Sequence, residues 1–133
     1  MSKKTIHKET FHTDLAPAAI GTYSQAVRHG DLVFISGQIP LDPTTMEIVD
    51  GDIRAHIVQV FENLSNICKA AGGSLNACVK LTVFLTDFTN FSLVNEVMAT
   101  FVDEPYPARA AIGVAELPKG VGVEIEAVMG LSD

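Results

Sequence analysis

The 133-residue chain lacks tryptophan, has only two cysteines and contains no long apolar run. No apolar segment approaches the ~20 residues that a membrane-spanning helix requires. The N-terminus has a basic start without an apolar core, so we expect no signal peptide. These absences favour a reducing, cytoplasmic location, in which Cys68 and Cys78 are free thiols without CxxC spacing.

Basic residues are also scarce, with 9 Lys and Arg against 16 Asp and Glu, which gives a net charge of -7. The basic residues are scattered and form no stripe, so the sequence disfavours nucleic acid as a partner. No glycine-rich phosphate loop precedes a helix, and no G-x-S-x-G motif is present. We expect no metal site, because no metal-ligand spacing occurs among the histidines, which are His7, His12, His29 and His56.

The length of the chain and its apolar content of 47% suit a single domain over residues 1–133 with a substantial core. The apolar periodicity predicts helices from about residue 53 to 71 and 89 to 102. Asp52 is the expected N-cap of the first helix, and Gly72-Gly73 its expected end. The other predicted elements are strands at 4–9, 32–38, 79–87, 108–115 and 121–129, an ordered loop entering a strand at 16–26, and a tight turn at 27–31.

This order predicts an α+β fold, a sheet with two helices packed on one face. Two helices cover only one face, yet apolar residues of both parities occur in 32–35, and Phe84 lies opposite Leu81 and Val83 on its strand. A partly apolar second face usually meets a protein partner, so we predict a homo-oligomer. The alternative is that loops bury some of these strands.

Arg109 follows Pro105-Tyr106-Pro107-Ala108 at the start of a predicted strand. Strand parity places it with Ala111 and Gly113, on a face of small side chains that leaves room for a ligand. If the helices cover the opposite parity, Arg109 points to the far face. Glu124 and Glu126 would share that face, because Val123 and Ile125 alternate with them.

Two interpretations of Arg109 remain open at this point. The arginine pairs with Glu124 or Glu126 as a structural group, across the sheet or across an interface, or it clamps a ligand carboxylate bidentately. The two glutamates are first of all solvated or paired strand residues. Core packing is the default role of Tyr23, and Ser36-Gly37 marks either a close backbone approach to a ligand or a β-bulge.

Taken together, a set of segments in order along nearly the whole chain resembles the RidA/YjgF family of reactive-intermediate deaminases. The matching segments are Ala16 to Ala26, Ile35-Ser36-Gly37-Gln38-Ile39-Pro40, Phe61-Glu62-Asn63-Leu64, Lys80 to Asp87, Val94-Asn95, Tyr106-Pro107-Ala108-Arg109, Leu117-Pro118-Lys119-Gly120 and Val123-Glu124-Ile125-Glu126-Ala127. No single segment is decisive, but the set at these spacings is highly specific.

The resemblance implies a chorismate-mutase-like α+β fold with a six-stranded mixed sheet, and a homotrimer with three sites at subunit interfaces. It implies hydrolysis of enamines and imines such as 2-aminoacrylate, 2-iminopropanoate and 2-iminobutanoate to 2-oxo acids and ammonia, without a cofactor. These intermediates come from pyridoxal-phosphate enzymes, so the implied role is control of metabolite damage.

The resemblance also implies roles for individual residues. Arg109 matches the arginine that binds the substrate carboxylate, and Glu124 matches the glutamate that positions or activates water. The remaining substrate-binding candidates are Tyr23, Ser36, the backbone at Gly37, and Asn95, whose role stays open.

The chain departs from the family pattern at three positions. Thr22 replaces a common proline, Ala110 a frequent serine, and Ala111 a common cysteine. If that cysteine shapes reactivity or a redox response in relatives, this chain lacks it.

Two other functions compete with deamination. The same pocket in a non-catalytic module would sense a 2-oxo acid or a similar small carboxylate. An endoribonuclease or translation inhibitor is the third possibility, and the acidic charge counts against it.

Overall fold

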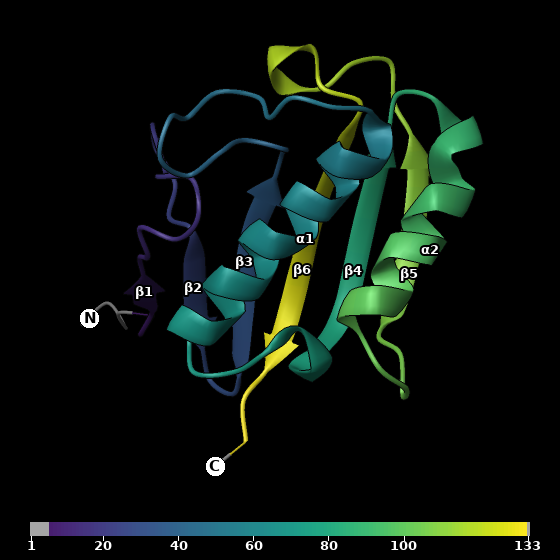
Figure 1. Cartoon of the computed structure of the whole chain (residues 1–133). Coiled ribbons are helices and arrows are strands. Elements are labelled where there is room, and N and C mark those ends of the chain that lie inside the picture. The colour runs from purple at the N-terminus through teal and green to yellow at the C-terminus, as the bar shows by residue number, and fades with distance from the viewer. Residues whose placement is uncertain (1–5, 133) are drawn as a thin grey trace.

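The computed structural model describes residues 6–132, and its elements follow the predicted order of strands and helices (Figure 1). The strands are β1 (Glu9–Phe11), β2 (Ala26–His29), β3 (Leu32–Gln38), β4 (Cys78–Leu85), β5 (Ala108–Gly113) and β6 (Val123–Gly130). The helices are α1 (Ile53–Ala70) and α2 (Phe91–Phe101), and short 3-10 turns occur at Leu75–Ala77, Phe88–Asn90 and Pro118–Gly120.

Within the described residues the strands form one mixed sheet in the order β1-β2-β3-β6-β4-β5. β4 and β5 are parallel and are joined through α2, as a parallel pair requires a crossover. The other neighbouring strands are antiparallel. Both helices lie against the same side of this sheet (Figure 1), so the predicted α+β fold with two helices on one face is confirmed.

The ends of α1 agree with the residues expected to define them. The Asp52 carboxylate accepts a hydrogen bond from the backbone N–H of Ala55, at 3.0 Å, which satisfies one of the free N–H groups of the first turn. At the other end Gly72 takes a φ of 93°, a left-handed conformation that ends the helix and that glycine adopts without a steric penalty. The helix buries one stripe against the sheet: Ile57, Val60, Phe61, Leu64 and Ile67.

Three local predictions were wrong in detail. The N-terminal strand is β1 at Glu9–Phe11 rather than at 4–9; residues 4 and 5 lie outside the described residues, and residues 6–8 are not in a strand. The turn occupies only Gly30 and Asp31, because residues 27–29 pair with β3 as part of β2. The second helix begins at Phe91, since residues 88–90 form a 3-10 turn in which the Asp87 carboxylate accepts from the backbone N–H of Thr89.

Strict alternation along the strand predicted at 79–87 would place Val79 on the same face as Leu81 and Val83. Instead, the register between β4 and β6 shifts between Cys78 and Lys80. Cys78 is therefore turned into the core at 5% exposure, and Val79 is turned out at 50% exposure. An irregularity of this kind breaks the strict alternation on which the prediction relied.

The sheet face opposite the helices is partly apolar, as the sequence predicted. Leu32 and Phe34 of β3 point away from the core, whereas Val33 and Ile35 between them are buried. Phe34 is 48% exposed and Ile112 of β5 is 43% exposed. We call this side of the sheet the open face. No helix within residues 6–132 is both long and apolar enough to cross a membrane.

Candidate functional site

The six residues predicted to form a site divide into two groups that line two separate cavities. Arg109 and Asn95 line the first cavity, and the other four line the second: Tyr23, Ser36, Gly37 and Glu124. We call these the arginine half-site and the glutamate half-site. Each is described from the elements that position it.

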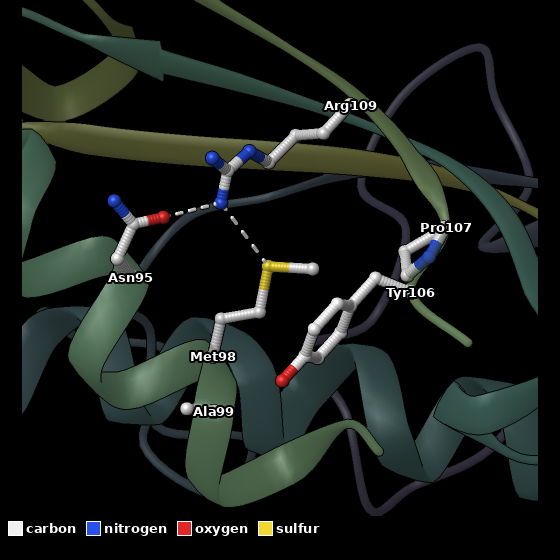
Figure 2. Close-up of a pocket in the computed structure, with 6 residues that line it drawn as sticks. All are labelled: Asn95, Met98, Ala99, Tyr106, Pro107 and Arg109. Carbon is white, nitrogen blue, oxygen red and sulfur yellow. Dashed lines mark hydrogen bonds between the residues drawn. The ribbon is translucent and has the colours of Figure 1, made fainter. Parts of the chain in front are cut away.

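The arginine half-site lies between the edge strand β5 and helix α2 (Figure 2). Its cavity has a volume of about 390 Å³ and is lined by Asn95, Met98, Ala99, Tyr106, Pro107 and Arg109. The Tyr106-Pro107 segment leads directly into β5, so the chain delivers Arg109 to the cavity at the second residue of the strand.

Helix α2 fixes the direction of the Arg109 side chain. Nη1 of Arg109 donates a hydrogen bond to Oδ1 of Asn95 at 2.6 Å and a weaker one to Sδ of Met98 at 3.6 Å (Figure 2). The guanidinium carbon lies 5.0 Å from the centroid of the Phe91 ring, a distance at which a cation is attracted by the ring face. These contacts hold the guanidinium in one orientation and give Asn95 a concrete structural partner.

Within residues 6–132 Arg109 has no carboxylate partner, since the ion pairs there join His12 to Asp14 and Arg54 to Glu96. An ion pair between Arg109 and Glu124 or Glu126 of the same chain, across the sheet, is therefore excluded, whereas pairing across a subunit interface stays a prediction. A guanidinium has five N–H donors, and protein atoms among the described residues take up only Nη1. The other nitrogen atoms of the guanidinium are free to donate hydrogen bonds to a planar anion.

The glutamate half-site lies at a bulge on the open face, where β3 meets β6. Ile35 pairs with Ala127 and Gln38 with Ile125, so Ser36 and Gly37 together stand opposite Glu126. The cavity there has a volume of about 730 Å³. Besides the four predicted residues, its polar lining includes Gln38, Lys119 and Glu126. Both interpretations of Ser36-Gly37 are compatible with this arrangement, since a bulge is present and lies beside a cavity.

The Glu124 carboxylate lies directly over Gly37. A Cβ placed on Gly37 would overlap Oε2 and Cδ of Glu124, so a larger residue at 37 would displace the carboxylate. Ser36 is held by its own bonds, because its Oγ donates to the carbonyl of Ser24 at 2.5 Å and its N–H donates to the carbonyl of Gln25 at 3.0 Å. The bulge is thereby attached to the loop that carries Tyr23.

The electrostatics of the glutamate half-site favour the neutral form of one carboxyl group. Burial, and secondarily the negative charge of Glu126, raise the pKa of Glu124 above its ordinary value. Glu124 is only half-buried, so water reaches the carboxyl group from the cavity. A carboxylate with a raised pKa is a stronger proton acceptor once it is ionised.

The two half-sites lie on opposite faces of the sheet. Arg109 pairs with Leu81, which is buried under the helices, and Glu124 pairs with Phe84. Leu81 and Phe84 are three residues apart on β4, so their side chains point to opposite sides. The prediction that Arg109 shares the far face with Glu124 was therefore wrong.

The error came from assuming that the larger side chains of β5 face the helices. The reverse holds: Ala111 packs on the core and Ile112 points to the open face. Side-chain size in β5 therefore does not identify the face that the helices cover, and the long Arg109 side chain lies on the helix side as well. Glu124 does lie on the open face, as expected.

Sequence reasoning named Asn95 without a role and missed Phe91 and Met98, which also orient Arg109 from α2. Phe91, Asn95 and Met98 follow one another at steps of four and three, which places them on one helix face. That spacing was a usable signal, although Phe91 and Met98 also fit the apolar stripe of the helix. No cluster of three or more potential metal-ligating side chains occurs in residues 6–132.

Known proteins resemble this chain over most of its length. The family model described as Endoribonuclease L-PSP matches residues 13–130. The chain belongs to the RidA/YjgF family. Among curated relatives, a RutC family protein of Pyrococcus horikoshii is 51% identical over 91% of this chain and 96% of its own length. A 2-iminobutanoate/2-iminopropanoate deaminase of Mus musculus is 46% identical over 93% of this chain and 92% of its own.

Solved structures of the RidA/YjgF family have the same fold. RidA from an Antarctic Psychrobacter is 56% identical and superposes with a TM-score of 0.89, covering 92% of this chain and 99% of that one. TdcF of E. coli with bound serine is 42% identical, with a TM-score of 0.87 over 93% of this chain and 99% of that one. The fold implied by the sequence resemblance is confirmed by these neighbours.

Proposed function

We propose that this protein hydrolyses 2-imino acids, and the enamines that tautomerise to them, to 2-oxo acids and ammonia. The observation that carries this proposal is Arg109, a guanidinium held in place by α2 with no carboxylate of its own chain to pair with. Deaminase-named relatives at this level of identity support the assignment. Small substrates of this class, 2-iminopropanoate and 2-iminobutanoate, carry the carboxylate that such an arginine binds.

In the proposed reaction Arg109 binds the substrate carboxylate through two parallel N–H···O bonds, which fixes the plane of the adjoining imine. Glu124 accepts a proton from a water molecule while the water oxygen bonds to the carbon of the protonated imine, and the C=N electron pair moves to nitrogen to give a neutral carbinolamine. Glu124 then passes this proton to the carbinolamine nitrogen, which leaves as ammonia while the C=O bond forms and the hydroxyl proton returns to Glu124. One water is consumed, and the residues present can hold and move the protons without a cofactor.

We propose further that a complete site takes two copies of the chain. Arg109 and Glu124 point away from each other on opposite sheet faces, so one copy does not bring both to one substrate. An interface that brings Arg109 of one copy next to Glu124 of another joins two different surfaces of the chain. In a closed ring, every copy makes this contact with its neighbours. The exposed apolar side chains of the open face, including Phe34 and Ile112, suit burial in that contact. The homotrimer with three intersubunit sites is the ring implied by the family resemblance.

Two parts of this proposal remain predictions about the cellular context. The substrates would be supplied by pyridoxal-phosphate enzymes that eliminate water from serine or threonine, since these release enamines. A cytoplasmic location would place the protein beside such enzymes.

The direct test generates 2-aminoacrylate in situ with a serine dehydratase and follows pyruvate release with and without this protein. We expect release above the spontaneous rate, in proportion to the protein added. Release at the spontaneous rate would refute the deaminase proposal. In that case, tight binding of pyruvate by calorimetry would favour the alternative of a non-catalytic carboxylate sensor.

The description Endoribonuclease L-PSP raises ribonuclease activity as a second candidate function. The net charge of -7 and the two glutamates of the larger cavity oppose the approach of a polyanion. RNA cleavage that persists after rigorous purification and disappears in Arg109→Ala would favour this candidate.

A further inference from the structure

Two thiols that are ten positions apart in the sequence lie side by side in the core and line neither half-site cavity. Cys68 belongs to the last turns of α1, and Cys78 is the first residue of β4. Their Sγ atoms are 3.8 Å apart and share a hydrogen bond. Cys68 is 0% exposed and Cys78 is 5% exposed.

The local backbone explains why these two residues meet. Helix α1 ends at Ala70, the left-handed Gly72 follows it, and the short turn at Leu75–Ala77 returns the chain to the sheet below the helix. The register shift after Cys78 then turns its side chain inward, under α1. Gly73 sits against the Met129 side chain, where a Cβ would overlap Sδ, so this return path is closely packed.

The environment of the pair makes the two thiols unequal. The hydrogen bond from Cys68 lowers the pKa of Cys78, whereas the same hydrogen bond and burial raise the pKa of Cys68. Cys78, the less completely buried of the two residues, is thus the one that more readily becomes a thiolate. The thiolate is the form that reacts with oxidants.

We propose that Cys68 and Cys78 form an oxidative modification site, at which a hydroperoxide converts the two thiols into a reversible intramolecular disulfide. The Cys78 thiolate attacks the peroxide oxygen, the O–O bond breaks, and a sulfenic acid and hydroxide form. The Cys68 sulfur then attacks Sγ of Cys78 and displaces the sulfenic oxygen, which leaves as water. In balance, two thiols and one hydrogen peroxide give one disulfide and two waters.

The geometry requires little movement for this second step. The S–S bond is about 2.05 Å long, so the two Sγ atoms must approach each other by about 1.8 Å. The disulfide would tie the end of α1 to the start of β4. Glu124 pairs with Phe84, six residues along β4 from Cys78 and therefore roughly 20 Å away. We expect oxidation to stabilise the fold and to leave deaminase activity unchanged.

The experiment treats the native protein with hydrogen peroxide and measures intact mass, free thiols and thermal unfolding. We expect a mass lower by two hydrogen atoms, loss of both thiols together, and a melting midpoint higher by roughly 5–10 °C. Dithiothreitol should restore all three values. Peptide mapping should recover the fragment pair joined through Cys68 and Cys78.

The single variants Cys68→Ala and Cys78→Ala provide matched controls. In Cys68→Ala, peroxide should add oxygen to Cys78 and raise the mass, because no second thiol is present to expel water. Wild-type thiols that react only after denaturation, oxygen adducts in place of the disulfide, or a bond between two chains would each overturn the proposal. Because the wild-type mapping needs no substitution, it tests the proposal even if a variant folds poorly.

Discussion

The arginine half-site and the glutamate half-site differ in how the protein prepares them. Arg109 is a cation already oriented by three side chains of one helix, and it is exposed at an edge strand. Glu124 is a half-buried carboxyl group on the opposite face, with a raised pKa and a second carboxylate beside it. We propose that the arginine half-site binds an anion and that the glutamate half-site accepts a proton. Neither is complete alone, which is why we place the reaction between two copies.

Removing the arginine should have the largest effect. Arg109→Ala should lower kcat/KM for the imine formed from 2-aminoacrylate by about 100- to 1,000-fold, because the substrate carboxylate loses a bidentate partner. The assay is pyruvate release, with oligomeric state and melting midpoint measured in parallel. Arg54→Ala, an exposed arginine that pairs with Glu96, is the matched control and should retain full activity. Equal activity in both variants would contradict the carboxylate-anchor role.

Glu124→Gln should lower kcat by about 100-fold and change KM little, because Arg109 still anchors the substrate. The same change should raise the melting midpoint at pH 7. A carboxyl group whose pKa is raised on folding stabilises the fold at low pH and loses that contribution as pH rises through the folded pKa. The stability difference between variant and wild type should therefore be small at pH 4 and larger at pH 7. Glu62→Gln, on the exposed side of α1, is the control, and a less stable Glu124→Gln at pH 7 would count against burial as the cause.

Gly37→Ala tests whether the position of the Glu124 carboxylate matters. The added methyl group would push the carboxylate aside, and we expect kcat to fall by about 10- to 100-fold. Gly130→Ala is the matched change, because a Cβ there meets Val79 at an ordinary 3.6 Å. If both variants were as active as the wild type, close packing over Gly37 would have no catalytic consequence.

The smallest expected effect concerns the neighbour of Glu124. If ionised Glu124 accepts the proton from water, the rate falls at low pH as Glu124 becomes protonated. Glu126 raises the pKa of Glu124, so Glu126→Gln should move this acidic limb to lower pH with little change in the maximal rate. The pH profile of kcat measures this shift. An unchanged limb, or one moved to higher pH, would show that Glu126 does not act on Glu124 through its charge.

Most of the fold could be predicted from the sequence, because apolar periodicity and the residues that end helices are local signals. Asp52 and Gly72 end α1 as predicted, and Leu32–Gln38 is a strand over its predicted length. The predicted orientation of Val79 was wrong because the alternation of apolar residues does not reveal a register shift between strands. The prediction for the face of Arg109 was wrong because side-chain size along β5 does not show which face the helices cover: Ala111 packs on the core and Ile112 is on the open face.

The candidate site was predictable as a set of residues but not as a geometry. The family resemblance named Arg109, Glu124, Tyr23, Ser36, Gly37 and Asn95 together. It gave no indication that the first two point to opposite faces in one chain, because that depends on which strands pair and in which register. The contact between Asn95 and Arg109 likewise depends on the packing of α2 against β5.

Subunit complementation tests the central claim, a site shared by two copies, most directly. Arg109→Ala and Glu124→Gln chains are unfolded together, refolded at equal concentrations, and assayed for pyruvate release, with mixed assemblies verified by native mass spectrometry. Each site in a random mixture has about one chance in four of combining an intact Arg109 with an intact Glu124, so we predict about one quarter of wild-type activity. Mixed assemblies no more active than either variant alone would contradict the shared site.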